Sequence, residues 1–285
     1  MASNSRIAVV TGANKGIGYF IALQLGLSGL FSKIILGCRD ATRGTLAATQ
    51  LQQTLADTNE NTSTELFRFV PLTIGDPNSH SDFCKTMQEE FGKVDVLVNN
   101  AGFAYKNADP TPFEGQTHKT LEINYYGLVD FTEKMMPLLR KGDDPRLVNV
   151  ASRAGRLGQV SRDLQDAFTD ETLTIPRLNA LIDEFKDDVR TGVHRQKGWS
   201  NTNYGISKLG VIAATRVWAR QEAALSSSSS NIKVNSCCPG YCDTDMTSHK
   251  GPRPANEGAK NAVIPATMDN PPTGAFFSNF GVAEW

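Results

Sequence analysis

The stretch Thr11-Gly12-Ala13-Asn14-Lys15-Gly16-Ile17-Gly18 decides the fold, because it joins an apolar run, Ile7-Ala8-Val9-Val10, to a segment with helical periodicity. Glycines in such a turn let the backbone approach a pyrophosphate closely, and the free N–H groups at the start of the following helix hold that anion. The stretch therefore predicts a strand–turn–helix unit that binds a dinucleotide. A generic glycine-rich turn is the alternative that this stretch alone leaves open.

Strand-like and helix-like segments alternate along almost the whole chain. Short apolar runs predict strands at residues 7–10, 33–36, 66–70, 94–98, 146–151, 232–235 and 275–277. Segments with a helical spacing of apolar residues lie between most of them. This alternation is typical of βαβ units, so we expect an α/β fold: a single doubly wound Rossmann domain over residues 1–285, with a parallel sheet of about seven strands.

Two stretches interrupt this alternation. Residues 156–200 form too long a segment for a loop. Apolar side chains recur there with helical spacing, at Leu178, Leu181, Ile182, Phe185 and Val189. We interpret residues 156–200 as a helical insertion in the domain, and we expect the serine run Ser226–Ser230 to be an exposed loop.

The composition limits the possible partners. Hydrophobic residues make up 40% of the 285 residues and charged residues 21%, an ordinary globular balance, and the formal net charge is -1. We therefore expect no nucleic-acid and no membrane partner. Five cysteines without a paired C-x-x-C pattern argue against a disulfide framework and against a metal site. Because no signal-like apolar segment follows Met1, the expected location is cytoplasmic.

The residues after the second expected strand indicate which dinucleotide binds. A carboxylate there binds the ribose diol of NAD(H), whereas cations accept the 2′-phosphate of NADP(H). This strand ends in Leu36-Gly37-Cys38-Arg39, Arg43 lies one turn further on, and Lys15 lies in the glycine-rich turn. Three cations can converge on one phosphate, and an arginine can bind it bidentately. We therefore predict NADP(H), and we interpret Asp40 as a helix cap rather than a ribose ligand.

Further motifs follow in a consistent order. They are Asn99-Asn100-Ala101-Gly102 after the fourth strand, Asn124 in the next helix, Ser152 after the fifth strand, Tyr204-Gly205-Ile206-Ser207-Lys208, and Pro239-Gly240 with Thr244. Together with the glycine-rich stretch, this ordered set resembles the classical short-chain dehydrogenases/reductases. The resemblance implies that the catalytic residues are Asn124, Ser152, Tyr204 and Lys208. The cofactor-binding residues predicted from the motifs and the cations are Gly12, Asn14, Lys15, Gly16, Ile17, Gly18, Arg39, Arg43, Thr73, Asn100, Ala101, Gly102, Tyr204, Lys208, Pro239, Gly240 and Thr244.

Within that family the chain is similar to the NADPH-dependent carbonyl reductases. The similarity rests on Asn14-Lys15, Cys38-Arg39-Asp40, residues 108–113, Cys237-Cys238-Pro239-Gly240, Glu284-Trp285 and the long segment before Tyr204. In those enzymes this segment covers a surface that relatives use to oligomerise, which implies a monomer here. The chain departs from the pattern at Thr73, where the family usually has an aspartate that contacts adenine. It also departs at Arg153-Ala154-Gly155, where carbonyl reductases have bulky apolar residues.

The spacing of Tyr204 and Lys208 suits proton transfer to a carbonyl oxygen, because residues one helical turn apart share a face. Lowering the pKa of a tyrosine from about 10 to about 7 takes roughly 4 kcal/mol. An ammonium about 4 Å away supplies about that much at an effective dielectric near 20, so we expect Lys208 to lower the pKa of Tyr204. Tyr204 then donates the proton, and Ser152 hydrogen-bonds the substrate oxygen. Lys208 also binds the nicotinamide ribose, and Asn124 anchors a water that links Lys208 to solvent.

The sequence thus predicts NADPH-dependent reduction of ketones, aldehydes and quinones, with a small-molecule carbonyl or alcohol as the partner. An alcohol or steroid-type dehydrogenase that works in the oxidative direction remains open, as does a lyase or epimerase on the same fold. A regulatory NADP(H)-binding protein without turnover is a third alternative, although it has no need of Ser152, Tyr204 and Lys208.

Two further groups of side chains lie near the expected site. Cys237 and Cys238 end the sixth strand, and we interpret them as small buried side chains rather than reactive thiols. Four aromatic residues either line an apolar substrate pocket or serve packing. They are Tyr105, Trp199, Tyr241 and Trp285.

Overall fold

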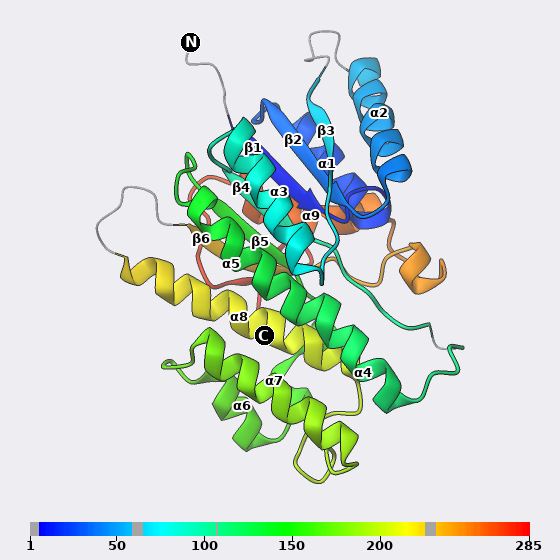
Figure 1. Cartoon of the computed structure of the whole chain (residues 1–285), viewed down its shortest axis with the longest axis vertical. Coiled ribbons are helices and arrows are strands. Elements are labelled where there is room, and N and C mark those ends of the chain that lie inside the picture. The colour runs from blue at the N-terminus through cyan, green and yellow to red at the C-terminus, as the bar shows by residue number, and fades with distance from the viewer. Residues whose placement is uncertain (1–5, 59–64, 107, 226–231) are drawn as a thin grey trace.

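The computed structural model describes residues 6–58, 65–106, 108–225 and 232–285 (Figure 1). Within them one sheet has the strand order β3-β2-β1-β4-β5-β6-β7-β8. The strands are β1 (Ile7–Thr11), β2 (Lys33–Cys38), β3 (Phe67–Pro71), β4 (Val96–Asn99), β5 (Arg146–Val150), β6 (Lys233–Cys238), β7 (Phe276–Ser278) and β8 (Gly281–Ala283). β1 to β7 pair in parallel, as the alternation predicts. The strand order reverses between β1 and β4, which is where doubly wound sheets bind their ligands.

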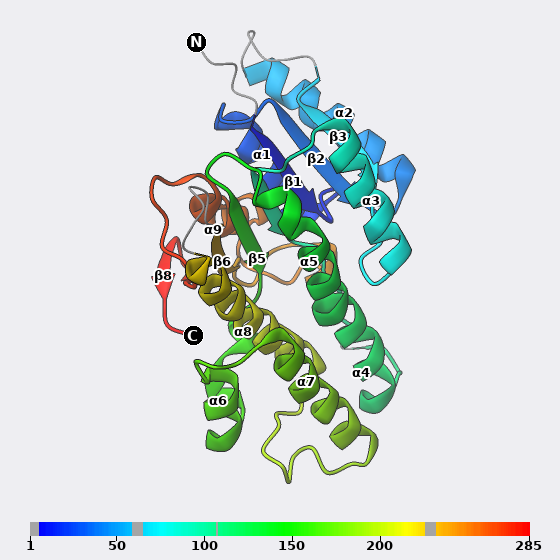
Figure 2. The same ribbon diagram turned by 60° about the vertical axis from the view of Figure 1, so that its left-hand side comes forward.

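Helices cover both faces of the sheet (Figures 1 and 2). They are α1 (Gly16–Leu27), α2 (Ala41–Thr58), α3 (Pro77–Glu90), α4 (Phe113–Leu121), α5 (Gly127–Leu139), α6 (Arg162–Thr169), α7 (Ile175–Arg190), α8 (Asn203–Ala224) and α9 (Ala255–Thr267). Successive strand residues point to opposite faces, so Val9 packs into the core under α3, α5 and α8, while Val10 packs into the core under α1, α2 and α9. This sorting produces two apolar cores, one on each side of the sheet.

The segment before α8 is helical, as its apolar spacing predicts. α6 and α7 lie beside α8 on the side away from the sheet (Figure 2). Leu178, Ile182 and Phe185 of α7 are fully buried and belong to the core that contains α8. The insertion therefore covers the outer face of the helix that carries Tyr204 and Lys208. The serine run 226–230 lies outside the described residues.

The sheet has one strand more than the predicted seven. β8 runs antiparallel to β7, and the pairing of Ser278 with Gly281 leaves a two-residue turn of Asn279 and Phe280. Both turn residues have positive φ, at 51° and 69°, as the favoured hairpin turns require. The Arg253 guanidinium donates to Asn279 (2.8 Å) and lies 5.4 Å from the centre of the Phe280 ring. Contacts from Arg253 thus stabilise this turn, which the residue types at positions 279 and 280 do not predict.

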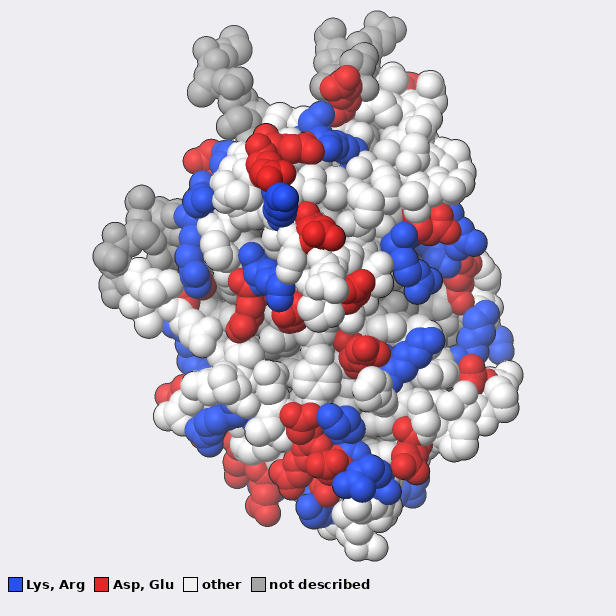
Figure 3. Space-filling view, viewed as in Figure 1, with Lys and Arg blue, Asp and Glu red and all other residues white. Residues whose placement is uncertain are grey.

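The surface carries both signs of charge. On the face shown in Figure 3, lysines and arginines are interspersed with aspartates and glutamates, and neither sign covers a large continuous area. Among the helices of the described ranges, none is both long and apolar enough to cross a membrane.

Candidate active site

The glycine-rich turn between β1 and α1 leaves room for an anion. Gly12 and Gly16 have positive φ (66° and 56°), which side chains other than glycine rarely adopt. A Cβ on Gly18 would lie 2.4 Å from both the Gly12 carbonyl oxygen and Asn100 Nδ2. Lys15, at the N-cap of α1, makes no side-chain hydrogen bond to the helix. The first N–H groups of α1 therefore remain available to a phosphate.

The end of β4 is tied to this turn by Thr11. The buried Thr11 hydroxyl accepts the backbone N–H groups of Asn100 (3.0 Å) and Ala101 (2.9 Å), and Asn100 Nδ2 donates to the Thr11 carbonyl (2.9 Å). The predicted cofactor residues Asn100 and Ala101 thus lie directly against the turn. Sequence reasoning missed Thr11 as a site residue; its signal is a polar side chain at the end of an otherwise apolar strand.

Tyr204 and Lys208 lie in the first two turns of α8 and share a face. Thr202 caps the helix by accepting the Gly205 N–H (3.0 Å). Lys208 Nζ lies 5.7 Å from the centre of the Tyr204 ring and donates to the Val150 carbonyl (2.8 Å) at the end of β5. The Ser152 side chain, two residues beyond Val150, lies close enough to the Tyr204 phenol to lower its pKa. The structure therefore brings Ser152, Tyr204 and Lys208 together, as the sequence predicts.

Asn124 joins the same group of side chains. It lies in a π-helical turn, Glu122–Tyr126, between α4 and α5, and such turns are common at functional sites. Its side chain accepts the Phe103 N–H (2.7 Å) and donates to the Phe103 carbonyl (2.8 Å). A Cβ on Gly102 would lie 3.5 Å from Asn124 Oδ1 and 3.6 Å from Lys208 Nζ, so Asn124 and Lys208 face the same glycine. Asn124 thus holds the loop after β4 through two hydrogen bonds to the Phe103 backbone. The link from Asn124 to Lys208 through a water stays a prediction.

Burial shifts the two titratable groups of this site in opposite directions. It raises the pKa of Tyr204 to about 12, while the Ser152 hydrogen bond acts weakly in the opposite sense. It lowers the pKa of the Lys208 ammonium to about 8. The expected lowering of the Tyr204 pKa is therefore wrong. Desolvation disfavours the phenolate, and Lys208 donates to the Val150 carbonyl rather than to the phenol oxygen.

Two of the three cations predicted to read a 2′-phosphate already have acidic partners. Lys15 Nζ lies 2.5 Å from Asp245 Oδ2, and Arg43 Nε lies 3.4 Å from Asp40 Oδ2. Asp40 also accepts the Arg43 backbone N–H (3.0 Å), which is the capping role expected of it. Arg39 is exposed at the end of β2. Thr73, the predicted adenine contact, is half-buried after β3, and its N–H donates to the Ser79 hydroxyl (2.9 Å).

The segment after β6 returns to the glycine-rich turn. Gly240 has a φ of 87°, and Arg253 donates to the Pro239 carbonyl (3.0 Å). The Thr244 methyl lies 3.4 Å from the position of a Cβ on Gly16, so Thr244 sits over the turn. Cys237, just before this segment, is fully buried, and burial raises its pKa far above the ordinary value. Cys237 and Cys238 are therefore packed side chains, as interpreted from the sequence.

Two of the four candidate pocket aromatics serve packing instead. Trp199 is buried in the insertion and donates to Asp188 Oδ2 (3.0 Å). Trp285 donates to the Gly155 carbonyl (2.8 Å) and packs against the core under α8. Tyr105 lies edge-on to Phe103 with ring centres 4.8 Å apart, and Tyr241 is 56% exposed. Only Tyr105 and Tyr241 thus remain candidates to meet a substrate.

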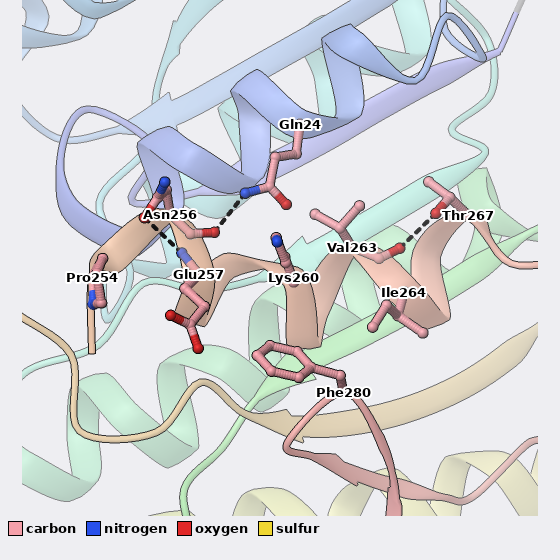
Figure 4. A pocket seen from close by; sticks show the side chains of 9 residues that line it. All are labelled: Gln24, Pro254, Asn256, Glu257, Lys260, Val263, Ile264, Thr267 and Phe280. Carbon is pink, nitrogen blue, oxygen red and sulfur yellow. Dashed lines mark hydrogen bonds between the residues drawn. The ribbon is translucent and has the colours of Figure 1, made fainter. Parts of the chain in front are cut away.

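A separate cavity of about 580 Å³ lies between α1, α9 and the β7–β8 turn (Figure 4). Its walls include Gln24, Lys260, Ile264 and Phe280, and Gln24 bridges the two helices by donating to the Asn256 carbonyl (2.6 Å). None of its lining residues belongs to the predicted site. This cavity is therefore distinct from the cluster of Asn124, Ser152, Tyr204 and Lys208.

Comparisons with known proteins agree with this geometry. The model of the short chain dehydrogenase family matches residues 6–163 and 190–255, and the gap between these ranges contains most of α6 and of α7. Carbonyl reductase (NADPH) 1 of Homo sapiens is 38% identical over 292 residues, which cover 100% of both chains. The Sus scrofa protein of that name is 37% identical over 291 residues, covering 100% of this chain and 96% of the other. The solved structure of salutaridine reductase from Papaver somniferum has a TM-score of 0.82 and 31% identity, covering 96% of this chain and 99% of that chain.

Proposed function

The chain belongs to the short chain dehydrogenase family, and from that premise we propose that it reduces ketones, aldehydes and quinones to alcohols with NADPH. NADPH-dependent carbonyl reduction is what the names of the relatives describe. The observation that carries the proposal is the meeting of Ser152, Tyr204 and Lys208 in one group of side chains near the glycine-rich turn. Neither the oxidative alternative nor the regulatory one is favoured by these findings.

The residues around the turn fit a dinucleotide. A diphosphate lies against Gly12, Gly16 and Gly18 and receives the free N–H groups of α1. Arg39 and Lys15 read the 2′-phosphate, with Arg43 beside them, while Asn14, Ile17, Thr73, Asn100, Ala101, Gly102, Pro239, Gly240 and Thr244 complete the walls of the cofactor site. Lys208 has three N–H donors and uses one on Val150, so two remain for the nicotinamide ribose. The bound cofactor supplies the hydride.

Tyr204 has the protonation state that the reduction step needs. With a pKa of about 12 the phenol keeps its proton at pH 7, which is what donation to a developing alkoxide requires. Ser152 hydrogen-bonds the carbonyl oxygen and places it near the phenol, and Asn124 holds the loop of Gly102 and Phe103 beside Lys208.

We further propose that residues 1–285 act as one catalytic domain and as a monomer. The support is the insertion, because α6 and α7 bury apolar side chains against α8 and so cover a helix face that would otherwise be open to another subunit. Light scattering at micromolar concentration tests this, and a dimer mass would refute it. A cytoplasmic location is supported by the five cysteines, all of which are unpaired.

The decisive experiment replaces Tyr204 by phenylalanine and follows NADPH absorbance with a quinone and a ketone. Tyr204→Phe should lower kcat by at least about a hundredfold, since general acids contribute about 10² to 10⁴, and should leave the dissociation constant of NADPH within about twofold. The matched control is Tyr126→Phe, whose phenol donates to Asp183 of the insertion instead. Turnover retained in Tyr204→Phe would remove this residue from the mechanism.

A further inference from the structure

A chain of charged side chains closes over the glycine-rich turn. Lys15 Nζ contacts Asp245 Oδ2 at 2.5 Å, Asp245 Oδ1 contacts His249 Nε2 at 3.1 Å, and His249 Nδ1 contacts Asp243 Oδ1 at 2.6 Å. Lys15 and Asp245 are 230 positions apart in the sequence, so the pair links the start of α1 to the segment after β6. This connection lies at the entrance to the proposed cofactor site, and the proposed mechanism does not use it.

The segment after β6 holds Asp245 in a defined place. A short 3₁₀ helix, Asp245–Thr247, starts with a reciprocal cap between Thr244 and Thr247. Ser248 and His249 then adopt positive φ (52° and 58°), a conformation that brings the His249 N–H onto the Thr244 carbonyl (3.0 Å). The imidazole consequently reaches back to both Asp243 and Asp245. The Asp245 carboxylate is therefore aimed at Lys15 by its own loop.

We propose that Asp245 tunes nucleotide specificity by competing with the 2′-phosphate for Lys15. The inference rests on the proposed function, in which Lys15 reads that phosphate. A dinucleotide without a 2′-phosphate leaves the Lys15–Asp245 pair closed, whereas one with a 2′-phosphate has to take the ammonium from the carboxylate. The carboxylate also repels any phosphate that shares Lys15 with it. Both effects lower the affinity for NADP(H) and leave the affinity for NAD(H) unchanged.

The size of the effect follows from exposure. The side chains of Lys15 and Asp245 are 54% and 60% exposed, so water screens the pair and its effect on binding is modest. Removing the competing charge should therefore strengthen NADP⁺ binding by about fivefold. Because salt screens exposed charges, the gain should shrink at 0.5 M NaCl.

The test is calorimetric titration of the purified protein with NADP⁺ and with NAD⁺. Asp245→Asn should lower the dissociation constant of NADP⁺ about fivefold and leave that of NAD⁺ within about twofold. Asp187→Asn, which opens an exposed pair with Arg190 on α7, is the matched control and should change neither. In the background of Lys15→Met, Asp245→Asn should gain less than about twofold, because the competition acts through Lys15.

Three results would overturn the inference. Weaker NADP⁺ binding in Asp245→Asn would mean that the carboxylate positions the segment after β6. An equal change for NADP⁺ and NAD⁺ would mean that it does not sense the 2′-phosphate. If the wild-type protein binds NADP⁺ and Asp245→Asn has the same dissociation constant, only the role of Asp245 is refuted. If the wild-type protein binds neither nucleotide, the proposed function is refuted as well.

Discussion

Lys208 should destabilise the folded protein in a way that depends on pH. Its side chain is almost fully buried, and burial lowers the pKa of its ammonium from 10.5 to about 8. The folded state therefore binds fewer protons than the unfolded state between these two values, and the free energy of unfolding rises with pH across that window. At 1.36 kcal/mol per unit, the depressed pKa costs about 3 kcal/mol at pH 7, about 2 kcal/mol at pH 9 and less than about 1 kcal/mol at pH 10.

The variant Lys208→Met isolates this cost. Methionine fills a similar volume without a charge, but it leaves the Val150 carbonyl without its donor, which costs about 1–3 kcal/mol at every pH. The absolute difference in stability therefore combines two opposing effects, whereas its pH dependence reports the charge alone. We expect the stability of the variant relative to wild type to fall by about 2–3 kcal/mol between pH 7 and pH 10.

Urea unfolding of both proteins at pH 7, 8, 9 and 10, with bound nucleotide removed, measures this difference. Lys208 has no influence on the pKa of Cys38, Cys84 or Cys242, and burial raises the pKa of Cys237 so far that its thiol stays protonated in both folded proteins over this range. Lys85→Met, at an exposed position on α3, is the control and should show no such slope. A difference between Lys208→Met and wild type that stays constant over this pH range would refute the claim that a buried ammonium with a depressed pKa lies beside Tyr204.

Two more predictions concern the ends of β1 and β6. Thr11→Val removes the acceptor of two backbone N–H groups, so it should lower the free energy of unfolding by about 1–3 kcal/mol and weaken NADP⁺ binding. Thr11→Ser keeps the acceptor and is the control. Equal losses of stability and of NADP⁺ affinity in both variants would contradict this reasoning. The cysteines should react slowly with Ellman's reagent at pH 7.5 in the native protein, because burial raises the pKa of Cys38, Cys84 and Cys242 to about 11 and that of Cys237 higher still. All five should react after unfolding, and rapid native labelling of Cys237 would show that its burial is transient.

Local patterns predicted most of the fold and the spatial grouping of Ser152, Tyr204 and Lys208. The seven parallel strands are apolar runs between helical segments, and the helix face shared by Tyr204 and Lys208 follows from their spacing. β8 escaped prediction because three residues are too short to show a period, and its turn depends on Arg253. The partners of Lys15 and Lys208 could not be predicted for other reasons. Asp245 lies 230 positions from Lys15 in the sequence. The acceptor of Lys208 is a backbone carbonyl, which every residue type carries.

Burial explains why the pKa values of Tyr204 and Lys208 shift in opposite directions. Burial disfavours any charged form, so the same environment makes the phenol keep its proton and makes the ammonium give one up near pH 8. A phenol with a pKa of about 12 stays protonated and ready for an alkoxide, but it exchanges its proton slowly with neutral water. A lysine with a pKa of about 8 exchanges protons efficiently near neutral pH. Under the function proposed above, these opposite pKa shifts would suit Tyr204 as the proton donor and Lys208 as the group that restores the proton.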